Sequence, residues 1–197
     1  MKRLIIPTIL LASVPFAAGA GEAYFGAGVG QMDIESAGFL QDFCDGCSSL
    51  AFKDSDTGFG AYFGYQITDA VAIELDYVDG GTLRDKDFLF CTGCVGEVSP
   101  QVTSLVGVGS VPLTGNLRLF GKAGVAFVSA DTKFDDGESG LIKTDGISTQ
   151  DLTLGTGLEY RFGRWRIRGE GQWIDIEDTD KALILMLSAA FSFGGSN

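Results

Sequence analysis

One stretch, from Gly58 to Tyr77, restricts the choice of fold more than any other part of the chain. Its sequence, GFGAYFGYQITDAVAIELDY, alternates with a period of two on both sides of a short segment at 68–70, which is typical of a β-hairpin. One face of both strands is aliphatic or aromatic, and the other combines glycine with Glu74 and Asp76. An apolar face toward lipid and a small, charged face toward a lumen account for this pattern, which predicts a transmembrane β-barrel.

Residues 1–20 have the features of an export signal. Lys2 and Arg3 precede a short apolar run, Leu4 to Ala12, and Ala18-Gly19-Ala20 fits the small-x-small rule for cleavage. A transmembrane anchor is the alternative, but about 20 apolar residues are needed to span a bilayer, and prolines interrupt this run. We therefore expect a signal peptide at 1–20 and one barrel domain at 21–197.

Alternation continues through the rest of the chain, in eight segments from residue 22 to residue 193. Short turns are expected at 68–70, 114–116 and 163–164, and longer polar connections at 33–56, 80–99 and 131–149, with a brief one at 178–181. An even number of strands, with tight turns at one end and long loops at the other, is typical of outer-membrane barrels. The predicted fold is all-β: an eight-stranded antiparallel up-and-down transmembrane β-barrel with long extracellular loops.

The fourth segment, 100–113, leaves open which of its faces lines the lumen. Val106 and Val108 share one face, whereas Leu105 and Val111 share the other. Both faces therefore carry apolar residues, and alternation alone does not orient this strand.

Aromatic residues gather near the ends of the strands. They are Tyr24, Phe25, Tyr65, Tyr160, Phe162, Trp165, Phe191 and Phe193. Amphipathic rings favour the boundary between lipid and water, so these residues are expected to mark that boundary. Ordinary strand propensity is the alternative explanation.

Composition excludes several classes of function. The net charge of −12 argues against nucleic acid as a partner. Histidine is absent, which removes histidine-based nucleophile activation, proton transfer and metal ligation. The G-x-S-x-G nucleophile motif does not occur either. We therefore predict a protein that is not an enzyme and holds no cofactor.

Eight charged residues fall on the predicted lumen face, as four acids and four bases. They are Glu74, Asp76, Lys122, Glu159, Arg161, Arg166, Arg168 and Glu170. A buried charge is costly unless it is paired, so the expected arrangement is an ion-pair network that fills the interior. The alternatives are a switchable ion path and paired carboxylates for acid–base catalysis, although adjacent arginines would keep both carboxylates ionised.

Two cysteine pairs stand in the first two long connections, as Cys44-Asp-Gly-Cys47 and Cys91-Thr-Gly-Cys94. An even number of cysteines in an exported chain favours disulfides, because thiols are oxidised outside the cytoplasm. A four-cysteine zinc site and a redox pair are the alternatives. The three possible disulfide connectivities stay open, and each would clamp the loops.

The first and third long connections are acidic. Their acids are Asp33, Glu35, Asp42, Asp45, Asp54 and Asp56, then Asp131, Asp135, Asp136, Glu138 and Asp145. We expect solvated loops, with bridging by divalent cations to anionic surface lipid as the alternative. The spacing at 131–138 does not match the twelve-residue EF-hand calcium loop.

Three stretches resemble the transmembrane domain of the outer membrane protein A family. GYQITDAVAIELDYVDG is similar to its second and third strands, VPLTGNLRLFGKAGVAFVSADTK to its fourth-to-fifth hairpin, and RIRGEGQW to its seventh strand. The resemblance implies an eight-stranded barrel in a Gram-negative outer membrane, without a separate peptidoglycan-binding domain. It also implies interior charges at Glu74, Lys122 and Glu170. Val108 stands where the family has an interior lysine, which argues against a gated pore.

The sequence therefore predicts a monomeric, non-enzymatic outer-membrane barrel with a structural or surface-interaction role. Outer-membrane lipid would surround it, and its acidic, cysteine-clamped loops would meet surface ligands or divalent cations. A narrow channel for ions or small solutes is the first alternative. A soluble lipocalin-like ligand-binding barrel is the second, and it would require the apolar face of each strand to line a cavity.

Overall fold

The computed structural model describes residues 21–36, 52–85, 95–135, 143–176 and 181–194. All regular secondary structure in these residues is β-strand. The described residues therefore contain no helix that could cross a membrane. The strands are β1 (Glu22–Ser36), β2 (Phe52–Gln66), β3 (Val71–Asp79), β4 (Leu83–Asp85), β5 (Val95–Thr114), β6 (Leu117–Asp135), β7 (Lys143–Phe162), β8 (Trp165–Ile174) and β9 (Lys181–Gly194).

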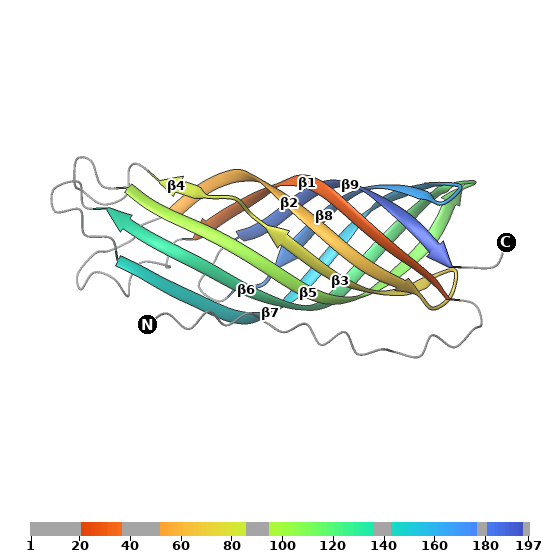
Figure 1. Cartoon of the computed structure of the whole chain (residues 1–197), viewed down its shortest axis with the longest axis horizontal. Helices are drawn as coiled ribbons and strands as arrows, with labels where there is room; N and C mark the ends of the chain where they lie inside the picture. Colours follow the sequence, from red (N-terminus) through yellow and green to blue (C-terminus); the bar gives the residue numbers. More distant parts are fainter. Residues whose placement is uncertain (1–20, 37–51, 86–94, 136–142, 177–180, 195–197) are drawn as a thin grey trace.

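The strands form one closed antiparallel barrel (Figure 1). Neighbours in the sheet follow the order β3-β2-β1-β9-β8-β7-β6-β5-β4, and pairing of β3 with β5 closes the wall. Because β3 and β4 both pair with the same side of β5, they occupy one position, and the barrel has eight strands. The predicted eight-stranded antiparallel barrel is confirmed.

The third position in the wall is interrupted between β3 and β4. The ladder between β2 and β3 ends at the pair Phe59–Asp79. Gly81 follows with a φ of 75°, a left-handed conformation that favours glycine. The backbone N–H of Thr82 then donates to Oδ2 of Asp56 at 2.8 Å, so a carboxylate on β2 supplies an acceptor where ladder pairing has stopped.

The tight turns lie where they were predicted, at 67–70, 115–116 and 163–164. The longer connections are shorter than predicted at both ends, because residues 33–36, 52–56, 83–85, 95–99, 131–135 and 143–149 belong to strands. A strand continues through polar residues as long as its backbone groups have hydrogen-bond partners on the neighbouring strand. The ladder between β5 and β6, for example, continues to the pair Val95–Asp135. The other residues of the three longer predicted loops, except 80–82, lie outside the described part of the chain.

The apolar faces of the strands point away from the lumen. Ile73 and Leu75 are 48 % and 43 % exposed, whereas Glu74 between them is completely buried. Other outward apolar side chains are Phe25, Val29, Phe63, Leu119, Phe127, Leu154, Leu158, Ile167, Leu185 and Leu187. A lipocalin-like barrel would bury these faces, so that alternative is wrong.

The tertiary structure also decides two orientations. In β5, Val106 and Val108 are buried in the lumen while Leu105 is exposed on the outside. Tyr24, which the sequence assigned to the lipid–water boundary, is only 1 % exposed and lies inside the barrel. That assignment was wrong because nearness to a strand end does not select a face, whereas alternation with the outward Phe25 does.

Candidate functional site: the charged lumen

Two layers of side chains fill the lumen along the barrel axis. The layer nearer the tight turns is charged, and we call the other one the apolar layer. The structure brings all eight charged residues predicted from the sequence into the first layer. Glu74, Asp76, Lys122, Glu159, Arg166 and Arg168 are buried there, the side chain of Glu170 is 6 % exposed, and Arg161 is partly exposed.

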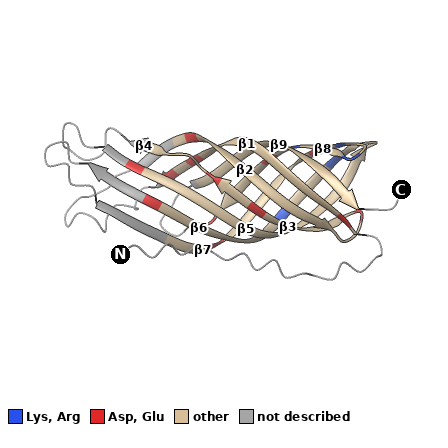
Figure 2. Cartoon of the chain, viewed as in Figure 1, with Lys and Arg blue, Asp and Glu red and all other residues tan. Residues whose placement is uncertain are grey.

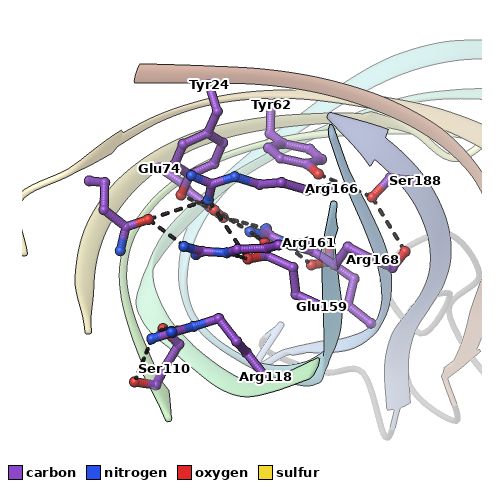
Figure 3. Close-up of polar contacts among 12 residues, drawn as sticks. Tyr24, Tyr62, Glu74, Ser110, Arg118, Glu159, Arg161, Arg166, Arg168 and Ser188 are labelled. Atoms are coloured by element: carbon purple, nitrogen blue, oxygen red, sulfur yellow. Dashed lines mark hydrogen bonds and ion pairs between the residues drawn. The ribbon is translucent and has the colours of Figure 1, made fainter. Parts of the chain in front are cut away.

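Arg168 on β8 is the central cation of the charged layer. Its Nη1 and Nη2 donate to Oε2 and Oε1 of Glu74 at 3.0 and 2.8 Å, a bidentate pair that crosses the lumen to β3 (Figure 3). Nη2 also donates to Oε2 of Glu159 on β7 at 2.9 Å, and Nη1 lies 3.7 Å from Oε2 of Glu170. One guanidinium therefore holds carboxylates on three strands, a geometry to which its planar fork is suited.

Aromatic rings enclose the Arg168 guanidinium. Its Cζ lies 4.7 Å from the ring centroid of Tyr62 and 4.5 Å from that of Phe120, within the range of cation–π attraction. Tyr24 donates its hydroxyl to Oε1 of Glu74 and so orients the carboxylate that Arg168 binds. The pair is therefore fixed by hydrogen bonds in its own plane and by rings around it.

Lys122 on β6 makes a second centre. Its Nζ donates to Oδ2 of Asp76 on β3 and to Oε1 of Glu170 on β8, both at 2.9 Å. Gly155 on β7 leaves room for this lysine, since a Cβ there would lie 2.8 Å from Lys122 Cγ. The ammonium group therefore bridges two carboxylates from opposite parts of the wall.

A third group closes the charged layer at the turn end. Arg166 donates through Nη2 to Oε1 of Glu22 at 2.7 Å and through Nη1 to Oε1 of Gln66 at 3.3 Å. Arg161 donates to Oε1 of Glu159 at 2.5 Å, and its Nη2 shares the Gln66 oxygen at 3.3 Å. These contacts connect β1, β2, β7 and β8 across the mouth of the lumen.

Several members of the charged layer were missing from the site predicted by sequence. They are Glu22, Tyr24, Tyr62, Gln66, Arg118 and Phe120. Tyr62, Gln66, Arg118 and Phe120 each have the same alternation phase as a predicted lumen residue on their strand or on the strand paired with it. Glu22 and Tyr24 on β1 alternate with the outward Phe25, which gives them the lumen phase. Selection by charge passed over the three rings and the amide of Gln66, and the charged residues Glu22 and Arg118 were left out although they have the lumen phase. Glycines on the lumen face make room for these larger side chains. A Cβ on Gly64, for example, would lie 2.1 Å from Cζ of Tyr24 and clash with its ring.

The apolar layer lies between the charged layer and the ends of the strands opposite the tight turns. It consists of Met32, Val78, Val102, Ala126, Val128, Ile174, Ala182, Ile184 and Met186, with Ile34 and Ile176 packed against it. A polar step separates the two layers, where Gln172 donates to the Thr153 hydroxyl at 2.9 Å. The sequence predicted a network of charges that fills the interior, whereas hydrophobic packing fills much of this half.

Other predicted site residues cannot be placed. Cys44, Cys47, Cys91 and Cys94 lie outside the described residues, as do the proposed signal peptide and the acids at 42, 45, 136 and 138. Among the described residues, no group of three or more cysteine, aspartate or glutamate side chains is arranged to hold a metal ion.

Paired carboxylates need different proton affinities to serve as acid and base in catalysis. Here Glu74 and Glu159 both contact Arg168, and Asp76 and Glu170 both contact Lys122. Each of these four carboxylates therefore shares a cation with a carboxylate on another strand. The arrangement therefore suits cross-linking of the barrel wall better than proton transfer to a substrate.

The chain matches the model of a known protein family. The model of the OmpA-like transmembrane domain matches residues 18–192, which is most of the chain. No curated protein matches the chain by sequence.

Solved structures with the same fold are outer-membrane barrels. OprG from Pseudomonas aeruginosa has a TM-score of 0.60 at 16 % identity, over 89 % of this chain and 97 % of that one. Ail, the attachment invasion locus protein of Yersinia pestis, solved with the heparin analogue sucrose octasulfate, has a TM-score of 0.57 at 17 % identity, over 89 % and 100 %. The N-terminal β-barrel domain of Pseudomonas aeruginosa OprF has a TM-score of 0.54 at 15 % identity, over 87 % and 97 %.

Proposed function

Because the chain belongs to the OmpA-like transmembrane domain family, we propose that it is a non-enzymatic barrel with a structural or surface-interaction role. It lies in the outer membrane of a Gram-negative bacterium, with its apolar faces in lipid. We infer that the barrel is closed from how its lumen is filled, and we infer its surface partner from where its charges lie. The proposal includes a disulfide clamp formed by Cys44, Cys47, Cys91 and Cys94.

One observation supports a closed barrel above all others: both lumen layers are packed. Arg166, Arg168 and Glu74 in the charged layer are each at most 2 % exposed, and Val102 and Ile174 in the apolar layer are 1 % exposed. An eight-stranded barrel encloses a space that side chains nearly fill. A hydrated ion would have to displace both layers, which disfavours the channel alternative.

We expect the purified protein to show no steady single-channel conductance in planar lipid bilayers, in symmetric 1 M KCl (roughly tenfold above physiological salt). Folded protein must be verified in the same preparation, by its heat-modifiable mobility in detergent gels. A porin inserted into the same bilayers provides the positive control. Reproducible ohmic steps from the folded protein would reject the closed barrel and favour the channel.

The end of the barrel opposite the tight turns is acidic. We call acidic rim the eight acids at this end whose side chains are described, Asp33, Glu35, Asp56, Asp79, Glu97, Asp131, Asp151 and Asp175 (Figure 2). The same end also carries the bases Lys53, Arg84, Lys133, Lys143 and Lys181 and the acids Asp54, Asp85, Asp135 and Asp145, so that acids exceed bases there by 12 to 5 in the described part of the chain. Over the whole sequence acids outnumber bases by 26 to 14. Such a field attracts cations and repels anions. The surface partner we propose is therefore a divalent cation or a basic ligand, in contrast to the sulfated sugar analogue bound in the Ail structure.

The rim proposal predicts salt-sensitive binding of a lysine-rich peptide to the protein in nanodiscs of zwitterionic lipid, without binding of heparin. Changing the exposed pair Asp131→Asn and Asp175→Asn should weaken peptide affinity about threefold to tenfold at low salt, because each exposed charge contributes modestly. Asp69→Asn, an exposed acid in a tight turn, is the matched control and should leave the affinity unchanged. Equal losses in both variants, or preferential heparin binding, would contradict an acidic binding rim.

A further inference from the structure

The charges of the lumen balance in number but not in position. Five acids and five bases line it, when Glu22 and Arg118 are added to the eight predicted residues. Arg118 is separated from the rest: among the described residues it pairs with no carboxylate, and its guanidinium donates to the backbone oxygens of Asp69 at 2.6 Å and Ser110 at 3.5 Å. The positive charge of Arg118 therefore lies at the turn end of the barrel and neutralises no carboxylate of the described residues.

The deficit appears at the other end of the charged layer. Glu74, Asp76 and Glu170 share only two cations there, Lys122 and Arg168. Glu159 is counted with the turn end, because Arg161 and Arg166 contact it there. If it were counted with Glu74, Asp76 and Glu170 instead, four carboxylates would share two cations and the deficit would be larger. The group around Lys122 is therefore at least one positive charge short.

Two buried carboxylate oxygens of this group have no hydrogen-bond partner among the described residues. They are Oδ1 of Asp76 and Oε2 of Glu170. Their side chains are only 7 % and 6 % exposed, and each carboxylate is bonded to Lys122 through its other oxygen. Oε2 of Glu170 still lies within ion-pair distance of Arg168, 3.7 Å from its Nη1, but accepts no hydrogen bond from it. Buried carboxylate oxygens without partners are costly.

Neutral polar residues are the ladder and strand neighbours of these carboxylates on the side of the apolar layer. Ser104 on β5 lies directly opposite Asp76 in the ladder, and Gln172 follows Glu170 by two residues on β8. The Gln172 amide donates to the Ser104 hydroxyl at 3.4 Å, so both side chains share one buried layer with Thr153. This layer contains the hydroxyl oxygens of Ser104 and Thr153 and the amide oxygen of Gln172. Oxygen atoms are the ligands that hard metal cations prefer.

We propose that the free carboxylate oxygens of Asp76 and Glu170 bind one small monovalent cation, of which Na⁺ is the simplest. Water would satisfy the hydrogen bonds of these oxygens but would leave the negative charge uncompensated. A divalent cation would overcompensate a deficit of one charge, and two carboxylates provide few ligands for it. The bound ion completes the charged layer and makes barrel stability depend on sodium.

The test is thermal unfolding of the whole folded protein in uncharged detergent, followed by its gel mobility and tryptophan fluorescence. Sodium chloride replaces choline chloride at constant ionic strength and constant pH. The unfolding midpoint should rise by about 4 °C in a saturable way as sodium increases, because a ligand bound only to the folded state stabilises it by mass action. Line broadening of ²³Na in nuclear magnetic resonance reports binding directly.

Asp76→Asn removes the excess charge, so it should abolish both the sodium-dependent rise and the line broadening. Glu170→Gln provides a second variant should the first fail to fold. Glu22→Gln also removes one lumen acid, but at the turn end, and should keep the sodium response. A wild-type midpoint that is equal in sodium and choline, a response that survives both Asp76→Asn and Glu170→Gln, or a midpoint that follows pH but not sodium would each overturn the proposal.

Discussion

Arg168→Met should destabilise the folded barrel by about 3–5 kcal/mol, the largest loss we expect from a single lumen substitution. Methionine retains much of the length of the side chain but leaves Glu74, Glu159 and Glu170 without their shared cation. Glu74 is completely buried, so its charge has no water to replace the lost guanidinium. Urea unfolding in detergent micelles, followed by tryptophan fluorescence and heat-modifiable mobility, measures the change in free energy.

The control for this substitution is Arg164→Met in the exposed turn between β7 and β8. It removes the same charge from the surface and should change stability by no more than about 0.5 kcal/mol. Adding Glu74→Gln to Arg168→Met should recover part of the loss, because the stranded carboxylate is then neutral. Similar effects of Arg168→Met and Arg164→Met would show that the lumen pairs contribute little to stability.

Leu154→Arg should cost about 2–4 kcal/mol in lipid vesicles, because it places a charge on the lipid face within the hydrocarbon. Leu154 is 45 % exposed and lies between the ladder partners Ala123 and Trp173 in the wall. The free energy is obtained from reversible unfolding by guanidinium chloride in vesicles of defined thickness.

Gln150→Arg is the matched control for the lipid face. Gln150 is on the same strand and the same face, four residues nearer the end opposite the tight turns, and it is also exposed. The cost of a charge falls to about 0–1 kcal/mol near the interface, so the two variants should differ clearly. Equal costs would mean that the hydrocarbon does not end between these two positions.

The lumen shows how far reasoning from sequence extends and where it stops. Side chains alternate strictly across a strand, so the phase of the opening hairpin placed Glu74 and Asp76 inside and their apolar neighbours outside. The same rule oriented Lys122, Glu159 and Arg168 correctly. It did not orient β5, whose two faces are both apolar, and the structure placed Val106 and Val108 inside only through their ladder with β3 and β6.

The sequence by itself therefore determined the eight-stranded barrel, its lipid face and eight of the ten charged residues of its lumen, because these follow from a local period of two. Only the tertiary structure decided which charges meet. Glu74 and Arg168 are separated by β4, β5, β6 and β7 along the chain, and closure of the wall brings them within 2.8 Å. The apolar layer and the charge deficit at Asp76 and Glu170 have the same origin. They depend on the register of strands around the closed barrel, which no single strand specifies.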